Sequence, residues 1–205
     1  MPNRQPDLFS YVVDTDSGFA PNPYGDICTL ACCKSSIRQN ANIGDWIIGT
    51  TKSPNTGRLV YAMQVDRSLT FDLYWDYPEY EHKKPCKNNM CGDNIYKKGT
   101  NGVLVQMKNI SHGEEHFQSD TKVNRVLISK TFYYFGQEAP EIPSQHKNII
   151  KKGRGYKRTR PTAKNYDVVT EFLEWLQNNF KQGVHGNPAH LKKKCKLPDI
   201  KLCKH

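Results

Sequence analysis

Hydrophobic positions along the chain fall into short runs separated by turn-forming residues, which predicts several strands and few helices. LFSYVV at residues 8–13 and DWIIGTT at residues 45–51 are rich in β-branched and aromatic residues and predict strands. SPNTGR has the Pro, Asn and Gly content of a hairpin turn and leads into LVYAMQVDRSLTF, a second long strand. GVLVQMK and VNRVLISKTFYYFG are the third and fourth strand candidates, the last interrupted by Lys130.

Two segments show helical spacing. In DICTLACCKSSIRQNAN, residues 26–42, apolar positions recur roughly every turn and predict a short helix or turn. NYDVVTEFLEWLQNNFKQG predicts one strong amphipathic helix at about residues 166–182. Asn165 is positioned to cap this helix and Gly183 to end it.

The remaining segments set the domain organisation. Residues 72–102 are aromatic, charged and rich in turn formers, and they predict an insertion folded over the core. We expect an α+β class with a small, mostly antiparallel barrel or sheet and a few helices, including the C-terminal amphipathic helix. Residues 1–146 form the expected core domain, and residues 147–205 supply a basic arm, the helix and a basic tail.

Charge changes this picture because it is unevenly distributed. Residues 147–205 hold 15 Lys and Arg against 4 Asp and Glu, whereas residues 1–146 hold 15 against 16. The net charge of +10 therefore comes from the C-terminal segment. A concentrated basic segment is typical of proteins that bind a polyanion, and nucleic acid is the expected partner, although a solubilising tail fits the same charge.

Apolar runs are too short for a membrane span, and the mean hydropathy is −0.75. The N-terminal residues have no apolar signal core, so a cytoplasmic location without membrane contact is expected. The chain has seven cysteines, and in a reducing compartment these are expected as free thiols, ligands or catalysts rather than as a disulfide framework.

The order of elements from Leu8 to Trp75 resembles PUA-like domains, especially those of the EVE type. A first strand leads through a loop to a short helix bearing Arg38, and a Gly-Asp turn then feeds a strand and a returning strand. The resemblance implies a PUA-like barrel or sheet and a pocket for a base.

A closer resemblance is to the nucleotide modification associated domain family, type two. The blocks that carry it are DTDSGFAPNPYGDICTLACCK, GDWIIGT, RLVYAMQV, GDNIY and RVLISKTFYYFG, between Asp14 and Gly136. The resemblance implies a context of modified DNA bases, and thus DNA rather than RNA as the partner, but it implies no particular reaction.

Candidate binding residues follow from these segments. Gly18, Pro21 and Pro23 predict a stiff loop beside which a base can stack or be read. The predicted base or nucleotide contacts are Phe19, Asn22, Lys34, Arg38, Trp46, Trp75, Asn94 and Tyr96. Lys34 and Arg38 are four residues apart, so a helix would direct both towards one phosphate. The alternative is that the aromatic residues belong to the core and the two cations are solvated.

The segment KNIIKKGRGYKR provides the predicted phosphate contacts. Its two glycines allow close backbone approach, and its tyrosine can stack between cations. The predicted residues are Lys151, Lys152, Arg154, Tyr156, Lys157 and Arg158. A flexible basic linker is the alternative.

Enzymatic chemistry is a second hypothesis, with Asp16 or Asp93 as acid or base. The available groups also include Cys28, Cys33 and Tyr96, but the chain has no familiar catalytic motif. The cysteine spacings do not match usual zinc knuckles, so neither a metal nor another cofactor is expected. A third hypothesis is an interaction scaffold without a ligand pocket. The sequence leaves the oligomeric state open.

Overall fold

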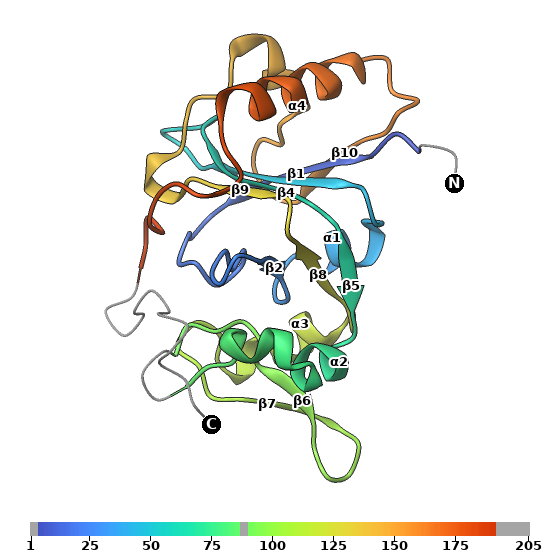
Figure 1. Cartoon of the computed structure of the whole chain (residues 1–205), viewed down its shortest axis with the longest axis vertical. Helices are drawn as coiled ribbons and strands as arrows, with labels where there is room; N and C mark the ends of the chain where they lie inside the picture. Colours follow the sequence, from blue (N-terminus) through green and yellow to red (C-terminus); the bar gives the residue numbers. More distant parts are fainter. Residues whose placement is uncertain (1–3, 87–89, 192–205) are drawn as a thin grey trace.

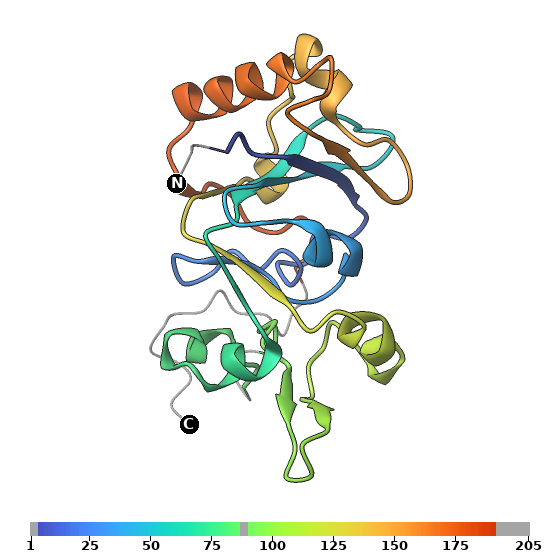
Figure 2. The same ribbon diagram turned by 90° about the vertical axis from the view of Figure 1, so that its right-hand side faces the viewer.

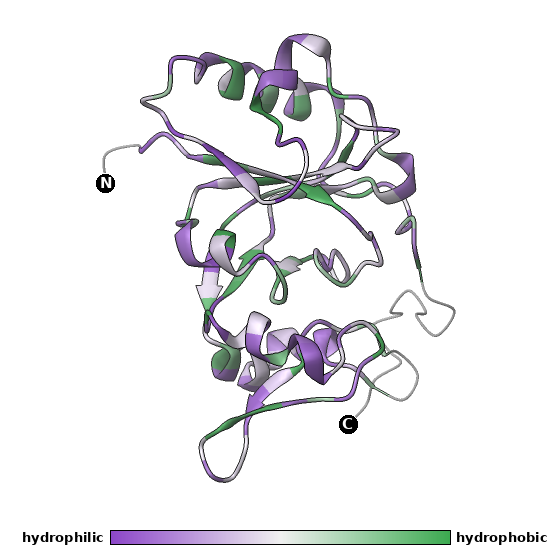
Figure 3. Ribbon diagram, turned by 180° about the vertical axis from the view of Figure 1, so that it is seen from behind, coloured by the Kyte–Doolittle hydropathy of each residue, from purple (hydrophilic) through white to green (hydrophobic). Residues whose placement is uncertain are grey.

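The structure is a computed structural model that describes residues 4–86 and 90–191. Its elements form stacked layers: a helix over a large sheet, a smaller sheet beneath it, and a layer of short helices with a hairpin (Figures 1 and 2). Hydrophobic and hydrophilic residues alternate along the covering helix in Figure 3, as expected for a helix with one face on a core.

The large sheet has six strands and two open edges. In spatial order they are β10 (Tyr156–Thr159), β1 (Leu8–Val13), β3 (Trp46–Thr51), β4 (Leu59–Gln64), β9 (Phe132–Tyr134) and β11 (Gly183–Val184). The pairs β1–β3 and β9–β11 are parallel, and the other neighbouring pairs are antiparallel. The α+β class is therefore correct, but the described strands close no barrel, and the likeness to PUA-like domains remains a prediction.

One face of this sheet is covered by helix α4 (Asp167–Asn179) and the 3₁₀ helix η4 (Ser144–Ile149). Val169, Phe172 and Leu176 are the buried residues of α4, and they pack on strand residues that include Trp46. The residue before the helix is Tyr166, which makes no side-chain cap, so Asn165 is not the capping residue.

The opposite face packs on a three-stranded sheet of β2 (Cys28–Leu30), β8 (Val126–Ser129) and β5 (Arg67–Leu69). Two runs that the sequence predicts as single strands are each divided between the sheets. LVYAMQVDRSLTF forms β4 and β5, and RVLISKTFYYFG forms β8 and β9 before the 3₁₀ turn η3 (Gly136–Glu138). At the crossing, the Asp66 carboxylate accepts the amides of Lys130 and Thr131, so the two chain segments bend together.

The lower layer contains most of the predicted insertion. Its elements are α2 (Phe71–Asp76), η1 (Pro78–Lys83), β6 (Tyr96–Lys98), β7 (Leu104–Gln106), η2 (Glu114–His116) and α3 (Phe117–Thr121). Tyr74, Tyr80 and Tyr96 are buried in a third core that they share with residues of the 27–32 segment. Burial of these aromatic rings explains why a segment with so many turn formers is ordered.

A buried lysine fixes this layer to the loop that precedes β2. The Lys83 ammonium donates to the Asn22 backbone oxygen at 2.9 Å, to Asn22 Oδ1 at 2.8 Å and to the Ile27 oxygen at 2.6 Å. Burial lowers the pKa of Lys83 to about 8, and the nearby Asp93 carboxylate opposes that decrease.

The predicted early helix is shorter than expected. Residues 28–30 form strand β2, and helix α1 (Ser35–Asn40) begins only after a corner at Cys33 and Lys34. Both corner residues have positive φ, 57° and 40°. Lys34 therefore precedes the helix, and the expectation that Lys34 and Arg38 lie together on one helix face is wrong.

Arg38 is fully buried and holds the corner against a distant segment. Its guanidinium donates to the backbone oxygens of Cys33, Asp120, Val123 and Arg125 at 2.5–2.8 Å. It therefore has a structural position, and its predicted contact with a nucleotide phosphate would require these bonds to break.

The C-terminal segment is part of the main sheet as far as residue 191. Strand β10 pairs with β1, β11 pairs with β9, and α4 covers the sheet between them. The predicted basic arm is thus partly an edge strand, whereas the basic tail at residues 192–205 lies outside the described residues. Within the described part of the chain, no helix has the length and apolar character needed to cross a membrane.

We predict that Arg38→Lys destabilises the fold by about 3 kcal/mol, because a single ammonium cannot satisfy all four buried backbone oxygens. Urea unfolding of the full chain measures this change. Arg58→Lys is the matched control: Arg58 is exposed and its guanidinium donates to one backbone oxygen, that of Ala139, so its cost should stay below about 1 kcal/mol. Equal losses in the two variants would contradict the role given to Arg38.

Candidate functional site

A cavity of about 340 Å³ lies where three segments meet. The corner contributes Cys33 and Lys34, and the 111–116 segment contributes Ser111 and two histidines. The end of β1 and the following loop contribute Tyr11, Val13, Asp14, Thr15, Ser17, Phe19 and Ala20. We call it the Cys33 cavity. Its volume lies at the lower end of the range for small-molecule sites, so it can hold one flat ring.

A continuous chain of hydrogen bonds runs from the lining of this cavity into the protein. We call its members, Cys33, His112 and Asp120, the relay. Cys33 Sγ lies 3.3 Å from His112 Nε2, and His112 Nδ1 lies 2.6 Å from Asp120 Oδ2. Asp120 also accepts the Cys33 backbone N–H at 2.7 Å and the Tyr96 hydroxyl at 3.0 Å. In this order of groups, a thiol can transfer its proton to an imidazole that a carboxylate orients.

The electrostatics of the relay favour a charged imidazole. Burial disfavours the imidazolium of His112, but hydrogen bonds to Asp120 and Cys33 outweigh burial and raise its pKa to about 9. Burial also acts to raise the pKa of Asp120, yet the bonds from His112, the Cys33 amide and Tyr96 lower it overall. At neutral pH the relay therefore holds a carboxylate and a protonated His112.

Local backbone geometry presents the Cys33 side chain to the cavity. Non-glycine residues rarely adopt positive φ, and two consecutive ones need support from their surroundings. Two side chains provide this support: the Arg38 guanidinium donates to the Cys33 carbonyl, and the Asp120 carboxylate accepts the Cys33 amide. The thiol is only partly buried, unlike those of Cys28 and Cys32.

Two rings contact the relay histidine. Phe19 packs against His112 with 4.7 Å between ring centroids, and His116 stacks on it at 4.2 Å with the planes 15° apart. Both rings also line the cavity. Phe19 thus has the predicted position for contact with a base, although 98% of its surface is already covered by the protein.

Lys34 connects the Cys33 cavity with a shallow groove beside helix α1. Its ammonium sits over the Tyr11 ring at 4.4 Å from the centroid, and it forms no ion pair with any described residue. The groove, which we call the α1 groove, is lined by Lys34 to Ile37 on one side and by Gly155 and Tyr156 on the other. The basic segment near residue 155 therefore lies next to the cavity.

The two predicted catalytic aspartates lie elsewhere. Asp16 accepts the Tyr134 hydroxyl and the Ala189 amide, and it lines a second cavity of about 350 Å³ with Lys52 and Arg58. Asp93 is fully buried and accepts the hydroxyls of Thr29 and Tyr74 at 2.6 and 2.8 Å. Neither lines the Cys33 cavity, and their acid or base role stays a prediction.

Four other predicted base contacts are placed outside the cavity. Asn22 is buried and bonds Lys83 and the Cys91 oxygen, and Asn94 bonds the Tyr74 oxygen. Trp46 packs on Tyr133 in the core under α4. Trp75 is half-buried, with the ammonium groups of Lys84 and Lys97 over its ring. The structure therefore brings Phe19 and Lys34 to one site, with Tyr96 behind it through Asp120.

The other described cysteines differ from Cys33 in two ways. Burial raises the pKa of Cys28 to about 12 and that of Cys32 well above its ordinary value, so both pack as apolar groups. Cys86 and Cys91 are disulfide-bonded, which corrects the expectation of free thiols or ligands. Cys195 and Cys203 lie outside the described residues.

One group in the described chain has ligand atoms close enough for a metal ion. Cys32, His112 and Asp120 each offer one within 4.8 Å of the others. Three protein ligands are fewer than a closed structural zinc site uses, although catalytic zinc sites have that number. His112 and Asp120 already bond each other at 2.6 Å, so the geometry fits the hydrogen-bonded relay better.

His112 and Asp120 are the functional candidates that sequence reasoning missed. They lie 79 and 87 residues after Cys33, so no short motif joins them. The only local signal is SHGEEH, where two histidines stand in a polar stretch that fits no regular element.

Comparison with known proteins supplies a family. The family model described as nucleotide modification associated domain 2 matches residues 5–195, which is most of the chain. The chain belongs to this family. No curated protein and no solved structure gave a match. The family name associates the domain with nucleotide modification, and it assigns no residue to a role.

We predict that Asp120→Asn lowers the pKa of His112 from about 9, because the anionic partner of the imidazolium is lost. NMR titration of the His112 ring measures this change in pKa. Since the folded pKa exceeds the ordinary 6.5, the pair adds stability below that pH and loses it as the pH rises through about 9. Asp72→Asn, which removes a carboxylate paired with Lys98, should leave the His112 titration unchanged. An unaltered titration in Asp120→Asn would refute this assignment.

Proposed function

We propose that this protein binds a nucleotide or nucleic-acid strand during nucleotide modification, with a base in the Cys33 cavity and phosphates beside it. The observation that carries the proposal is the position of Lys34, which lines both the cavity and the α1 groove next to the basic segment. A cation at that junction suits the phosphate of a nucleotide whose base points into the cavity.

The cavity walls provide what a base requires. Tyr11 and Phe19 line it with aromatic rings of which only the edges are exposed, and Ser17, Ser111 and His116 add polar groups. Aromatic faces bind any base through stacking, whereas hydrogen-bonding groups select among bases.

The basic loop, residues 151–155, extends this site. Lys152 and Arg154 are exposed, Lys151 is half-buried, and none of the three forms an ion pair with a described residue. Gly153 and Gly155 have φ of 71° and 82°, which bends the loop tightly. Cations of this kind bind a nucleic-acid backbone by displacing the counterions condensed on its phosphates, so binding weakens as the salt concentration rises.

The other predicted phosphate contacts already interact with neighbouring residues of the protein. Tyr156 lines the α1 groove and packs on Phe9 at 5.9 Å, so its ring can stack with a base. Lys157 donates to the Asn148 oxygen, and Arg158 pairs with Asp7. We therefore place the phosphate contacts mainly on Lys34 and the basic loop.

This function fits a protein of the cytoplasm, and DNA is the preferred polymer because of the family association. A purely acid–base enzyme with Asp93 has less support, because that carboxylate is buried and bonded on both oxygens. A scaffold without a ligand leaves the adjacency of the cavity, Lys34 and the basic loop unexplained.

We predict that replacing Lys151, Lys152 and Arg154 together by Gln weakens binding of fluorescein-labelled dT15 at least tenfold at low salt. The slope of log K against log salt should become less negative by about 2, since each single-strand phosphate contact contributes about 0.7. Fluorescence anisotropy over a salt series gives both quantities, with an rU15 arm and a hairpin-duplex arm.

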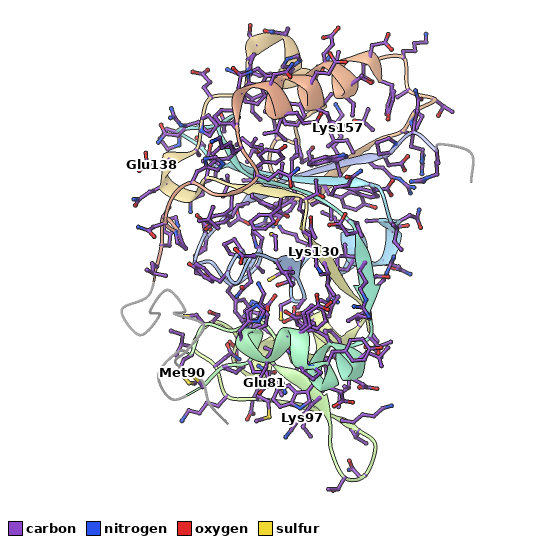
Figure 4. The ribbon with its side chains drawn as sticks, in the orientation of Figure 1. Glu81, Met90, Lys97, Lys130, Glu138 and Lys157 are labelled. Atoms are coloured by element: carbon purple, nitrogen blue, oxygen red, sulfur yellow. The ribbon has the colours of Figure 1, made fainter. Side chains whose placement is uncertain are left out.

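The matched control replaces Lys97, Lys98 and Lys108 by Gln, which removes the same charge from the hairpin end of the molecule. Figure 4 shows Lys97 at that end and Lys157 of β10 near the opposite end. The control should keep the wild-type slope. Absence of binding at low salt in the wild type, or equal slopes in the two triple variants, would overturn the proposal.

A further inference from the structure

We propose that Cys33 is a catalytic nucleophile that cleaves an acyl group from a nucleotide or base, with His112 as its acid and base. The nucleotide part of this substrate rests on the function proposed above, whereas the thiol chemistry rests on the relay geometry alone. Asp120 does not line the cavity, and it is a positioning residue for His112.

The relay satisfies the geometric requirements for such a nucleophile. A thiol needs a base within hydrogen-bond reach, and that base needs a third group to fix its ring and tautomer. The Cys33 to His112 and His112 to Asp120 contacts provide these at 3.3 and 2.6 Å. Sulfur is a large atom, so 3.3 Å is a direct contact.

Each part of the relay is fixed by neighbours that have no other evident purpose. Asp120 is buried and receives three donors, from His112, Cys33 and Tyr96. The rings of Phe19 and His116 both pack against the His112 ring. A thiol buried only for packing needs none of this, and Cys28 and Cys32 show that alternative in the same segment.

The reaction balances with water as the second reactant. The Cys33 sulfur forms a bond to the acyl carbon, the carbon–nitrogen or carbon–oxygen bond breaks, and the leaving group takes the proton from His112. Water then attacks the thioester, His112 accepts a proton from it, and the carbon–sulfur bond breaks to release a carboxylic acid. At the end, as at the start, one proton is shared between the Cys33 sulfur and His112, and no electrons are exchanged.

The surrounding charges come from every segment packed on the site. They are Lys34 and Arg38 from the corner and α1, His116 and Asp120 from the 112–120 segment, and Tyr96 from β6. Asp14 and Tyr11 come from β1 and the loop after it. Lys34, Asp14 and His116 line the Cys33 cavity itself, and Lys34 is the lysine there that suits a substrate with a negative charge near the cleaved bond.

Alkylation by iodoacetamide tests the thiol. All proteins in the series carry Cys195→Ser and Cys203→Ser, so that the thiols outside the described residues do not react. We predict one fast label at pH 6.5, located on Cys33 by peptide mass spectrometry and absent from Cys33→Ala. Cys28→Ala, which removes a buried thiol away from the relay, should label like the parent protein.

His112→Gln should label at least tenfold more slowly at pH 6.5 and approach the parent rate near pH 9.5, as an ordinary thiol does. Asp120→Asn should change the pH dependence of the labelling rate in the same direction by a smaller amount. A merely structural histidine would change the rate by the same factor at both pH values, after circular dichroism has shown that the variant folds.

p-Nitrophenyl acetate tests acyl transfer. The parent protein should release nitrophenolate in a burst and gain one acetyl group on Cys33, which hydroxylamine removes. Thiol reactivity like that of free cysteine, with no His112 dependence, would overturn the inference. So would a stoichiometric metal that masks Cys33 and is lost in Cys32→Ser. Binding of dT15 by the wild type is scored separately, so failure of either proposal is recognised without the other.

Discussion

The buried guanidinium of Arg38 is the interaction on which the candidate site depends. It connects the corner before α1 to the segment that follows α3, two parts of the chain more than 80 residues apart. Because a guanidinium offers five donors in one plane, it can satisfy several carbonyl oxygens that would otherwise be buried without partners. One of these oxygens belongs to Cys33 and another to Asp120. The same side chain therefore sets the positions of both ends of the relay.

This constraint explains why the site lies between layers. Two cores meet near the corner, one between the sheets and one within the lower layer. Neither core alone would hold His112, which reaches the relay from a segment between β7 and η2 that has no regular structure. Phe19 comes from the loop after β1, and His112 and His116 come from the segment after β7, so two distant segments contribute to one group of rings. A site built this way combines rigidity with an open face towards the α1 groove.

Sequence patterns predicted the strands well wherever alternation or β-branched runs were strong, as in β1, β3 and β4. They missed the division of two runs between sheets, because the bends at Asp66 and Lys130 depend on bonds between distant segments. Phe19 was predicted from loop chemistry and Lys34 from its helical spacing with Arg38, and both line the Cys33 cavity although that helical spacing is wrong. Arg38 and Trp46 were misleading, since their residue types suit a ligand and a core equally well. His112 and Asp120 became visible only when the fold brought them to Cys33.

Cys33 and Lys34 are neighbours in the chain, and both adopt rare left-handed backbone angles. These angles fix the directions in which the two side chains leave the backbone. The short Cys33 side chain is held close to its Cα, whereas the ammonium of Lys34 ends a flexible four-carbon stem. In the structure that ammonium lies 4.4 Å from the centroid of the Tyr11 ring. The left-handed corner thus places one strictly positioned group beside one adjustable group, so a ligand that contacted both would have more freedom at its anionic end than at the atom facing the sulfur.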